Sequence, residues 1–103
     1  MVTPLQGDVW WAETEDKRRP VLILTRSEAI PVLTRIVVAP ITRTVRGIPT
    51  ELPVGPAEGL PDACVASFDN LQALRISFLT ERIGTLAHGR DQICLTLRAF
   101  ADC

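Results

Sequence analysis

The chain has 103 residues, of which 47% are hydrophobic and 22% are charged, and its formal net charge is −1. This length predicts one domain over residues 1–103, and the composition argues against a disordered or fibrous protein. No apolar stretch reaches the roughly 18 residues of a membrane span, and the beginning of the chain does not read as a signal peptide. We therefore expect a soluble cytosolic protein with no membrane association.

The first two thirds of the chain contain short apolar runs separated by turn residues, and a further run follows, which predicts strands. The expected strands are residues 8–13, 20–26, 34–41, 50–54, 63–68, 70–75 and 82–87. The run Val21-Leu22-Ile23-Leu24 is apolar on both faces, as in a central strand of a small barrel. Proline lacks a backbone donor, so we expect the prolines at strand starts, bulges or edges and not inside central ladders.

The pattern changes near Arg90. Ile93, Leu97 and Phe100 recur at helical spacing, which predicts a helix of about three turns whose apolar stripe caps the barrel. The predicted fold is therefore mainly β with a C-terminal helix, in the form of a small single-domain β-barrel.

The two tryptophans and the three cysteines carry structural expectations. Trp10 and Trp11 are adjacent, so in a strand they point to opposite faces. One should enter the core, and the other is exposed or covered by a partner, with base stacking and dimer packing both open. The cysteines show no disulfide or zinc spacing. We expect Cys64 and Cys94 to be buried and Cys103 to be exposed.

The basic residues are concentrated in one segment. Residues 17–46 carry seven basic side chains against one acid, a formal charge of +6, although the chain as a whole is slightly acidic. If this segment folds back on itself as paired strands, its arginines could converge on a phosphate-binding face. A scatter of solvated surface charges is the alternative interpretation.

Several common catalytic patterns are missing from the chain. His88 is the only histidine and there is no tyrosine, which excludes a two-histidine ribonuclease within one protomer. The carboxylates show no ligand-like spacing, so neither a metal nor a cofactor is expected. The glycine-containing residues 55–59 lack the lysine and hydroxyl of a phosphate loop, and no serine belongs to a recognisable triad. His88 is expected to be a surface or capping residue.

What remains is an arginine with a hydroxyl. Arg19 precedes Pro20 at the start of one apolar run, and Thr42 follows the end of the next run. A guanidinium can bind a phosphodiester through two hydrogen bonds, and the Thr42 hydroxyl could donate another. Because a guanidinium stays protonated in proteins, Arg19 would act by charge stabilisation and by positioning the substrate.

The order of these motifs resembles that of the MazF/PemK family of bacterial toxin endoribonucleases. The resemblance is carried by Gly7-Asp8-Val9-Trp10-Trp11, by Arg19-Pro20 with the four aliphatic residues after it, and by Ala39-Pro40-Ile41-Thr42. Later segments, up to Ile83-Gly84-Thr85-Leu86, also follow the family's order. The resemblance therefore covers nearly the whole chain.

The resemblance implies an SH3-like barrel of the MazF/CcdB type and a toxin of a type II toxin-antitoxin system. Such a toxin cuts single-stranded messenger, ribosomal or transfer RNA without a metal and leaves 2′,3′-cyclic phosphate and 5′-hydroxyl ends. Arg19 and Thr42 match the family's catalytic positions. The resemblance also implies a homodimer in the bacterial cytoplasm and an antitoxin whose disordered acidic segment occupies the RNA groove. The expected RNA contacts are Lys17, Arg18, Arg26, Arg43 and Arg46, with Asn70 in a supporting role.

Two other functions stay open. The same barrel also hosts non-enzymatic toxins, so a CcdB-like protein that binds and inhibits gyrase is an alternative. An inactive relative that binds RNA or antitoxin is another. It would be compatible with residues 14–18, which are short where many relatives have a longer loop over the active site. We expect this short loop to leave the groove more open.

Overall fold

A computed structural model describes residues 3–101, which form seven strands, one α-helix and four 3-10 helices. The strands are β1 (Asp8–Glu13), β2 (Arg18–Ile23), β3 (Arg35–Thr42), β4 (Glu51–Val54), β5 (Cys64–Ser67), β6 (Gln72–Arg75) and β7 (Leu79–Thr85), and they are followed by α1 (Gly89–Phe100). The 3-10 helices are η1 (Ile30–Val32), η2 (Pro56–Glu58), η3 (Phe68–Asn70) and η4 (Ile76–Phe78). All seven predicted strands are present, with ends that differ from the predicted ones by up to three residues. The 3-10 helices were not predicted, because three residues are too few to show a hydrophobic period.

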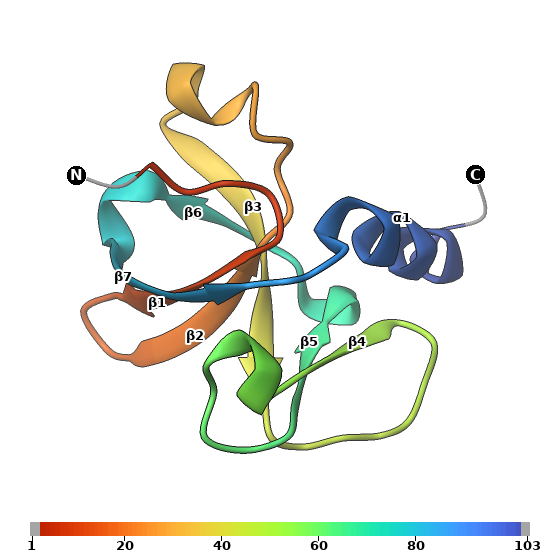
Figure 1. Cartoon of the computed structure of the whole chain (residues 1–103). Coiled ribbons are helices and arrows are strands. Elements are labelled where there is room, and N and C mark those ends of the chain that lie inside the picture. Colours follow the sequence, from red (N-terminus) through yellow and green to blue (C-terminus); the bar gives the residue numbers. More distant parts are fainter. Residues whose placement is uncertain (1–2, 102–103) are drawn as a thin grey trace.

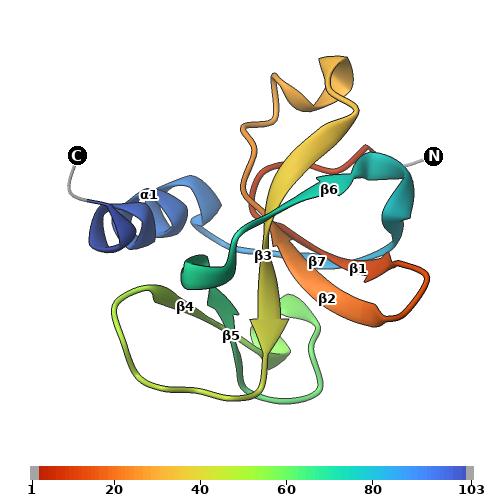
Figure 2. The same cartoon turned by 180° about the vertical axis from the view of Figure 1, so that it is seen from behind.

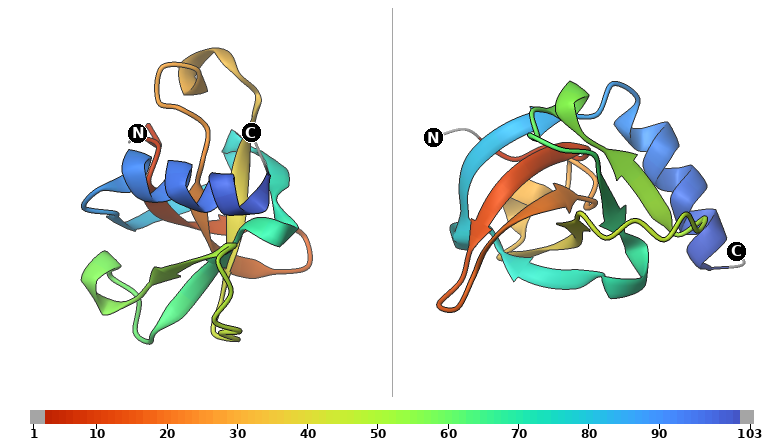
Figure 3. Two further views of the ribbon diagram at one scale, coloured as in Figure 1. Left: turned by 90° about the vertical axis from the view of Figure 1, so that its right-hand side faces the viewer. Right: turned by 90° about the horizontal axis from the view of Figure 1, so that it is seen from below.

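The strands form one antiparallel sheet with the order β4-β5-β3-β2-β1-β7, and β6 pairs with β3 off this path. β3 connects the two parts of the sheet. Its first residues pair with β6 and its last two pair with β5, while β2 lies along its middle. Figures 1 and 2 show this long strand running through the centre of the molecule. The strands curl into a half-barrel, with α1 along one side (Figure 3).

Two hydrophobic clusters lie on opposite faces of the central strands. Leu22 belongs to the first cluster, together with Phe68 and Ile93. Its neighbours Val21 and Ile23 belong to the second cluster, together with Trp10. This alternation explains why the run after Pro20 is apolar at every position. It confirms the prediction of a central strand.

The tryptophans point to opposite faces as predicted. Trp10 is buried in the second cluster, and its indole Nε1 donates a hydrogen bond to the buried Asp8 carboxylate at 3.3 Å. Trp11 is half-buried, and the Arg18 guanidinium lies 4.1 Å from the centre of its ring.

Pro40 corrects one expectation, because it lies inside β3, a central strand. The Leu24 N–H donates to the Val37 carbonyl at 3.0 Å. In an antiparallel ladder, every second residue points its backbone N–H and C=O toward the same neighbouring strand. Val37 and Ala39 therefore point these groups toward β2, whereas the nitrogen of Pro40 points toward the opposite side of β3. On that side β3 passes from β6 to β5, so the missing N–H breaks no bond to β2.

The helix α1 begins with His88 in the N-cap position and packs against β4 and η3. His88 is exposed, as expected of a surface residue, and its side chain makes no cap hydrogen bond. Of the predicted apolar stripe of α1, Ile93 is buried but Phe100 is exposed. The helix therefore packs on the sheet with a narrower stripe than predicted. Within the described residues, no helix is long and apolar enough to cross a membrane.

Cys64 is buried as predicted, but Cys94 is exposed on α1, so the prediction for Cys94 was wrong. Cys94 follows Ile93 on the helix and therefore points away from the stripe that packs on the sheet. Cys103 lies outside the described residues.

Candidate active site

The pairing of β2 with β3 brings Arg19 and Thr42 together. The observed register sets Leu22 opposite Ala39 and Val21 opposite Pro40. Continued past the last paired residues, it sets Arg19 opposite Thr42. In consecutive antiparallel strands the start of one strand lies beside the end of the next, which is why two residues far apart in the sequence meet at one end of the sheet.

Arg19 and Thr42 line a polar cavity of about 350 Å³, which we call the central cavity. Its other lining residues come from β3, β4, β5, β6 and the connections between strands. They are Pro40, Ile41, Thr44, Arg46, Glu51, Ser67, Asn70 and Gln72. The central cavity thus holds two arginines, the Glu51 carboxylate and several neutral hydrogen-bonding groups.

Two further cavities meet the central cavity at Arg19. The hairpin cavity, of about 240 Å³, lies beside the β1–β2 turn and includes Lys17 and Gln72. The tryptophan cavity, of about 450 Å³, includes Trp11, Arg18 and Arg43. We call the three cavities together the cationic groove.

Among residues 3–101, Arg19, Arg46 and Lys17 are the cations of the groove without an ion pair. Arg18, in contrast, pairs with Glu13 and Glu81. Arg43 contacts Asp62 at 3.7 Å. Two of these three cations line the central cavity, where an anionic ligand would meet them, and Lys17 lines the adjoining hairpin cavity.

The Thr42 hydroxyl is oriented by its own loop. The Thr44 backbone N–H donates to Thr42 Oγ1 at 3.1 Å. This bond uses a lone pair of the oxygen and leaves the hydroxyl proton for another acceptor. Thr42 can thus donate a hydrogen bond to a ligand oxygen in the central cavity.

Glu51 holds the loop that follows Thr42. Its Oε1 accepts the backbone N–H groups of Arg46 at 2.9 Å and of Gly47 at 3.0 Å. These bonds fix the backbone that carries Arg46. Near it, Asn70 Nδ2 donates to Ser67 Oγ at 2.9 Å, which orients the amide at the cavity wall.

Most of the residues predicted to contact RNA line the cationic groove. Arg46 and Asn70 line the central cavity, Lys17 the hairpin cavity, and Arg18 and Arg43 the tryptophan cavity. Arg26 is different. It follows the far end of β2 from Arg19 and lines none of the three cavities, so its place in the fold gives the predicted contact no support.

Sequence reasoning did not select four polar residues of the central cavity, namely Thr44, Glu51, Ser67 and Gln72. Gln72 arrives through a long-range pairing, opposite Val38 on β3. Its position could not be read from a local pattern. Glu51 offered a weak signal, since a carboxylate just after a turn can cap the turn's backbone N–H groups.

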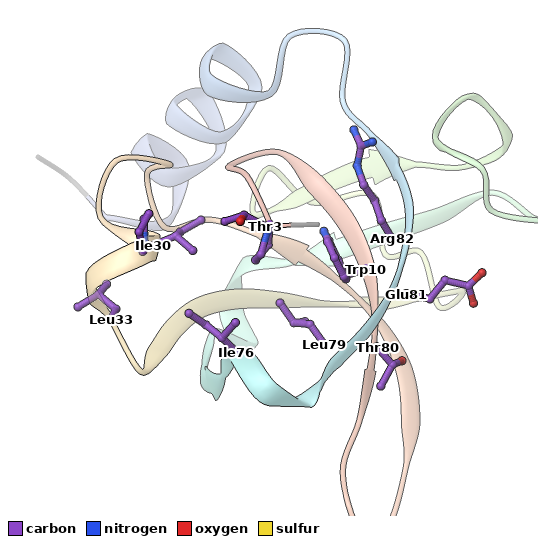
Figure 4. A pocket seen from close by; sticks show the side chains of 11 residues that line it. Thr3, Trp10, Ile30, Leu33, Ile76, Leu79, Thr80, Glu81 and Arg82 are labelled. Carbon is purple, nitrogen blue, oxygen red and sulfur yellow. The ribbon is translucent and has the colours of Figure 1, made fainter. Parts of the chain in front are cut away.

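A fourth cavity, larger than each of the three cavities of the groove, lies elsewhere. This apolar chamber, of about 490 Å³, is lined by Thr3, Pro4, Trp10, Ile30, Pro31, Leu33, Ile76, Leu79, Thr80, Glu81 and Arg82 (Figure 4). Its one arginine, Arg82, lies 3.4 Å from the Asp8 carboxylate. Because its positive charge is paired and its walls are apolar, the chamber is poorly suited to a phosphodiester.

Residues 3–101 contain no group of three or more histidine, cysteine or acidic side chains that could hold a metal ion. The groove presents guanidinium, ammonium, hydroxyl, amide and carboxylate groups.

The fold and the groove define a class: a small half-barrel protein with free arginines and a hydroxyl at the strand ends. The family model described as the PemK-like, MazF-like toxin of type II toxin-antitoxin systems matches residues 5–100, and the chain belongs to this family. The resemblance inferred from the sequence and the predicted fold class are both confirmed.

Individual relatives agree with this membership. The chain is 39% identical over 103 residues to a probable endoribonuclease, MazF5 of Mycobacterium tuberculosis H37Rv, covering 97% of the chain and 94% of that relative. The solved structure of the Mycobacterium tuberculosis toxin MazF-mt6 is similar with a TM-score of 0.81 and 43% identity, covering 90% of this chain and 95% of that one. A mycobacterial endoribonuclease in complex with its cognate antitoxin gives a TM-score of 0.78 and 25% identity, covering 92% and 91%.

Proposed function

We propose that this family member is a toxin endoribonuclease that cuts single-stranded RNA at short sequence motifs without a metal ion. The observation that carries the proposal is the meeting of Arg19 and Thr42 in a cavity that also holds the unpaired Arg46. Relatives named as MazF endoribonucleases support it. Cleavage of messenger, ribosomal or transfer RNA would inhibit translation and growth.

The reaction is an internal transfer at phosphorus. The 2′-hydroxyl loses its proton, its oxygen bonds to the adjacent phosphorus, and the bond to the 5′-oxygen breaks as that oxygen gains a proton. The products are a 2′,3′-cyclic phosphate and a 5′-hydroxyl. Arg19 would bind two non-bridging oxygens, and Thr42 would donate to one of them as negative charge accumulates.

The shape of the groove favours a single strand. A duplex holds its backbone in a regular helix, whereas the reaction needs the 2′-oxygen, the phosphorus and the 5′-oxygen in line. In a splayed single strand the phosphate can enter the central cavity while neighbouring bases enter the two flanking cavities. Binding itself would thus supply part of the required geometry.

The working assembly in this proposal is a cytoplasmic homodimer regulated by an antitoxin. Large apolar side chains such as Val37, Leu95 and Phe100 remain exposed on the protomer, and a second copy would cover part of this surface. The charge of the cationic groove suits an acidic, disordered antitoxin segment that folds on binding. Light scattering of the purified protein tests the dimer.

The decisive experiment is incubation of the purified protein with total bacterial RNA in EDTA, followed by mapping of the new 5′-hydroxyl ends. Arg19→Ala is the paired variant. Because Arg19 is exposed and makes no ion pair among the described residues, its loss should leave the fold intact. It should lower cleavage by about 10²–10³-fold. Arg98→Ala, which removes an exposed arginine of α1, serves as the matched control.

Full activity in a folded Arg19→Ala variant would overturn the assignment of Arg19. If the wild-type protein yields no discrete ends, the weight moves to the non-enzymatic, gyrase-inhibiting alternative, which a DNA supercoiling assay measures directly.

A further inference from the structure

The tryptophan cavity, of about 450 Å³, has several flat or apolar side chains in its walls. Its walls include the half-buried Trp11 ring together with Pro20, Ile41, Leu60 and Pro61. Thr42 and Arg19 line both this cavity and the central cavity. A group in the tryptophan cavity would therefore lie directly beside a phosphate in the central cavity.

A carboxylate also lines this cavity. The side chain of Asp62 lines the cavity and is 59% exposed. Its Oδ2 lies 3.7 Å from Arg43 Nη1, which exceeds ordinary hydrogen-bond distance. In the part of the chain that the structure describes, the Asp62 carboxylate accepts no hydrogen bond. It remains available to a ligand.

The Asp62 backbone is fixed while its side chain is not. Cys64 Sγ donates to the Asp62 carbonyl oxygen at 3.4 Å. The buried thiol thereby ties the turn that presents the carboxylate to the first hydrophobic cluster. Arg43, which also lines the cavity, balances the Asp62 charge, so the carboxylate need not repel a nearby phosphate strongly.

Apolar walls with a polar edge suit a nucleobase, whose faces stack and whose edges form hydrogen bonds. An ionised carboxylate is only an acceptor. Adenine, cytosine and guanine each present an exocyclic amino group as a donor. Uracil has no amino group and presents its one ring N–H between two carbonyl oxygens, which a carboxylate repels.

We propose that the tryptophan cavity receives the base next to the scissile phosphate, and that Asp62 selects bases carrying an amino group against uracil. This inference rests on the proposed nuclease function and adds a specificity residue to it. Pro20, Pro61 and the Trp11 side chain, one face of which the Arg18 guanidinium covers, pack against the ring of any base, and Asp62 discriminates among bases.

The test uses a pool of RNA substrates randomised on both sides of a cut site, and both cleavage fragments are sequenced so that the base on each side of the cut is read. The wild type should disfavour uracil about tenfold at one position next to the cut, as expected for one charge-assisted hydrogen bond. Asp62→Asn should lose this bias, because an amide both donates to and accepts from a base edge. Glu15→Gln, in the β1–β2 turn and outside all three cavities, should keep the wild-type motif.

A second measurement separates binding from cleavage. Short oligonucleotides made uncleavable by a 2′-deoxy residue at the cut site are titrated with adenine or uracil at the selected position. The wild type should prefer adenine, and Asp62→Asn should bind both alike.

Each outcome bears on the inference. An unchanged motif in folded Asp62→Asn, or no bias against uracil at either flanking position, would overturn it while leaving the nuclease assignment in place. If the wild-type protein cuts no RNA, the proposed function fails and the inference fails with it.

Discussion

The cationic groove and the apolar chamber belong to the same small sheet but differ in chemistry. The chamber is the larger single hollow, at about 490 Å³ against 350 Å³ for the central cavity. A choice by size and apolar lining would select the chamber. A phosphodiester, however, needs free positive charge and hydrogen-bond donors, and these lie in the groove.

The two regions differ in whether their charged side chains are paired. Arg82 of the chamber wall is paired with Asp8, which is only 1% exposed and also accepts hydrogen bonds from the Leu5 N–H at 2.9 Å and from Trp10 Nε1 of the chamber wall. These groups satisfy one another and stabilise the fold. In the central cavity, Arg19 and Arg46 face no carboxylate within ion-pair distance among residues 3–101. Unpaired charge, more than volume, marks the candidate site.

The largest expected effect outside Arg19 is that of Thr42→Val in the central cavity. Valine keeps the shape and loses the hydroxyl, so cleavage should fall by about 10²–10³-fold, the usual effect of removing one oxyanion donor. Thr42→Ser keeps the hydroxyl and should stay close to the wild type. Initial rates on a fixed RNA substrate measure both variants, and a Thr42→Val enzyme with normal rates would remove Thr42 from the mechanism.

Leu79→Ala in the chamber should instead lower stability and leave cleavage unchanged. Leu79 is buried in the second hydrophobic cluster, but it borders an existing cavity, so the free energy of unfolding should fall by about 2–3 kcal/mol, toward the lower end of such substitutions. Val32→Ala, at a highly exposed neighbour in η1, should change it by less than about 0.5 kcal/mol. Urea unfolding measures both. Cleavage per folded molecule should not change, and a large fall in it would mean that the chamber takes part in catalysis.

The proximity of Arg19 and Thr42 can be predicted from the sequence because the two residues belong to consecutive strands that pair with each other. Two consecutive apolar runs form neighbouring antiparallel strands, and the start of one then lies beside the end of the other. The confirmed strands follow from the same short-range patterns. The roles of Arg19 and Thr42 in catalysis stay predictions.

The rest of the central cavity depends on contacts that the local pattern does not encode. Gln72 and Ser67 reach the cavity because β3 changes partner from β6 to β5 along its length, and no periodicity reports such a switch. The exposure of Cys94 was missed for a similar reason, since α1 buries only a narrow stripe that includes Ile93. Arg26 was grouped with the other arginines by its position in the sequence. In the structure Arg19 lies near the start of β2 and Arg26 follows its end, so the length of β2 separates the two side chains.

A smaller effect is expected from Arg46→Ala. Arg46 adds a second free cation to the central cavity, so its removal should lower cleavage about tenfold and reduce the salt dependence of binding by about 0.7 in the logarithmic slope. Its backbone N–H still donates to Glu51 in the variant, so the loop should persist. Binding of an uncleavable oligonucleotide at several salt concentrations measures the slope, and an unchanged slope would place Arg46 outside the phosphate contacts.

The smallest effect is expected from Glu51→Ala. This variant tests whether cleavage in the groove depends on the loop that Glu51 holds, in contrast to the chamber, where a substitution should lower stability only. Without the carboxylate, the N–H groups of Arg46 and Gly47 lose their acceptor, and cleavage should fall severalfold because Arg46 is less well positioned. Glu51→Gln keeps an acceptor oxygen and should behave like the wild type. If Glu51 acts only through Arg46, the double variant Glu51→Ala with Arg46→Ala will be no slower than Arg46→Ala alone. Additive losses would instead mean that the Glu51 carboxylate acts on the substrate directly.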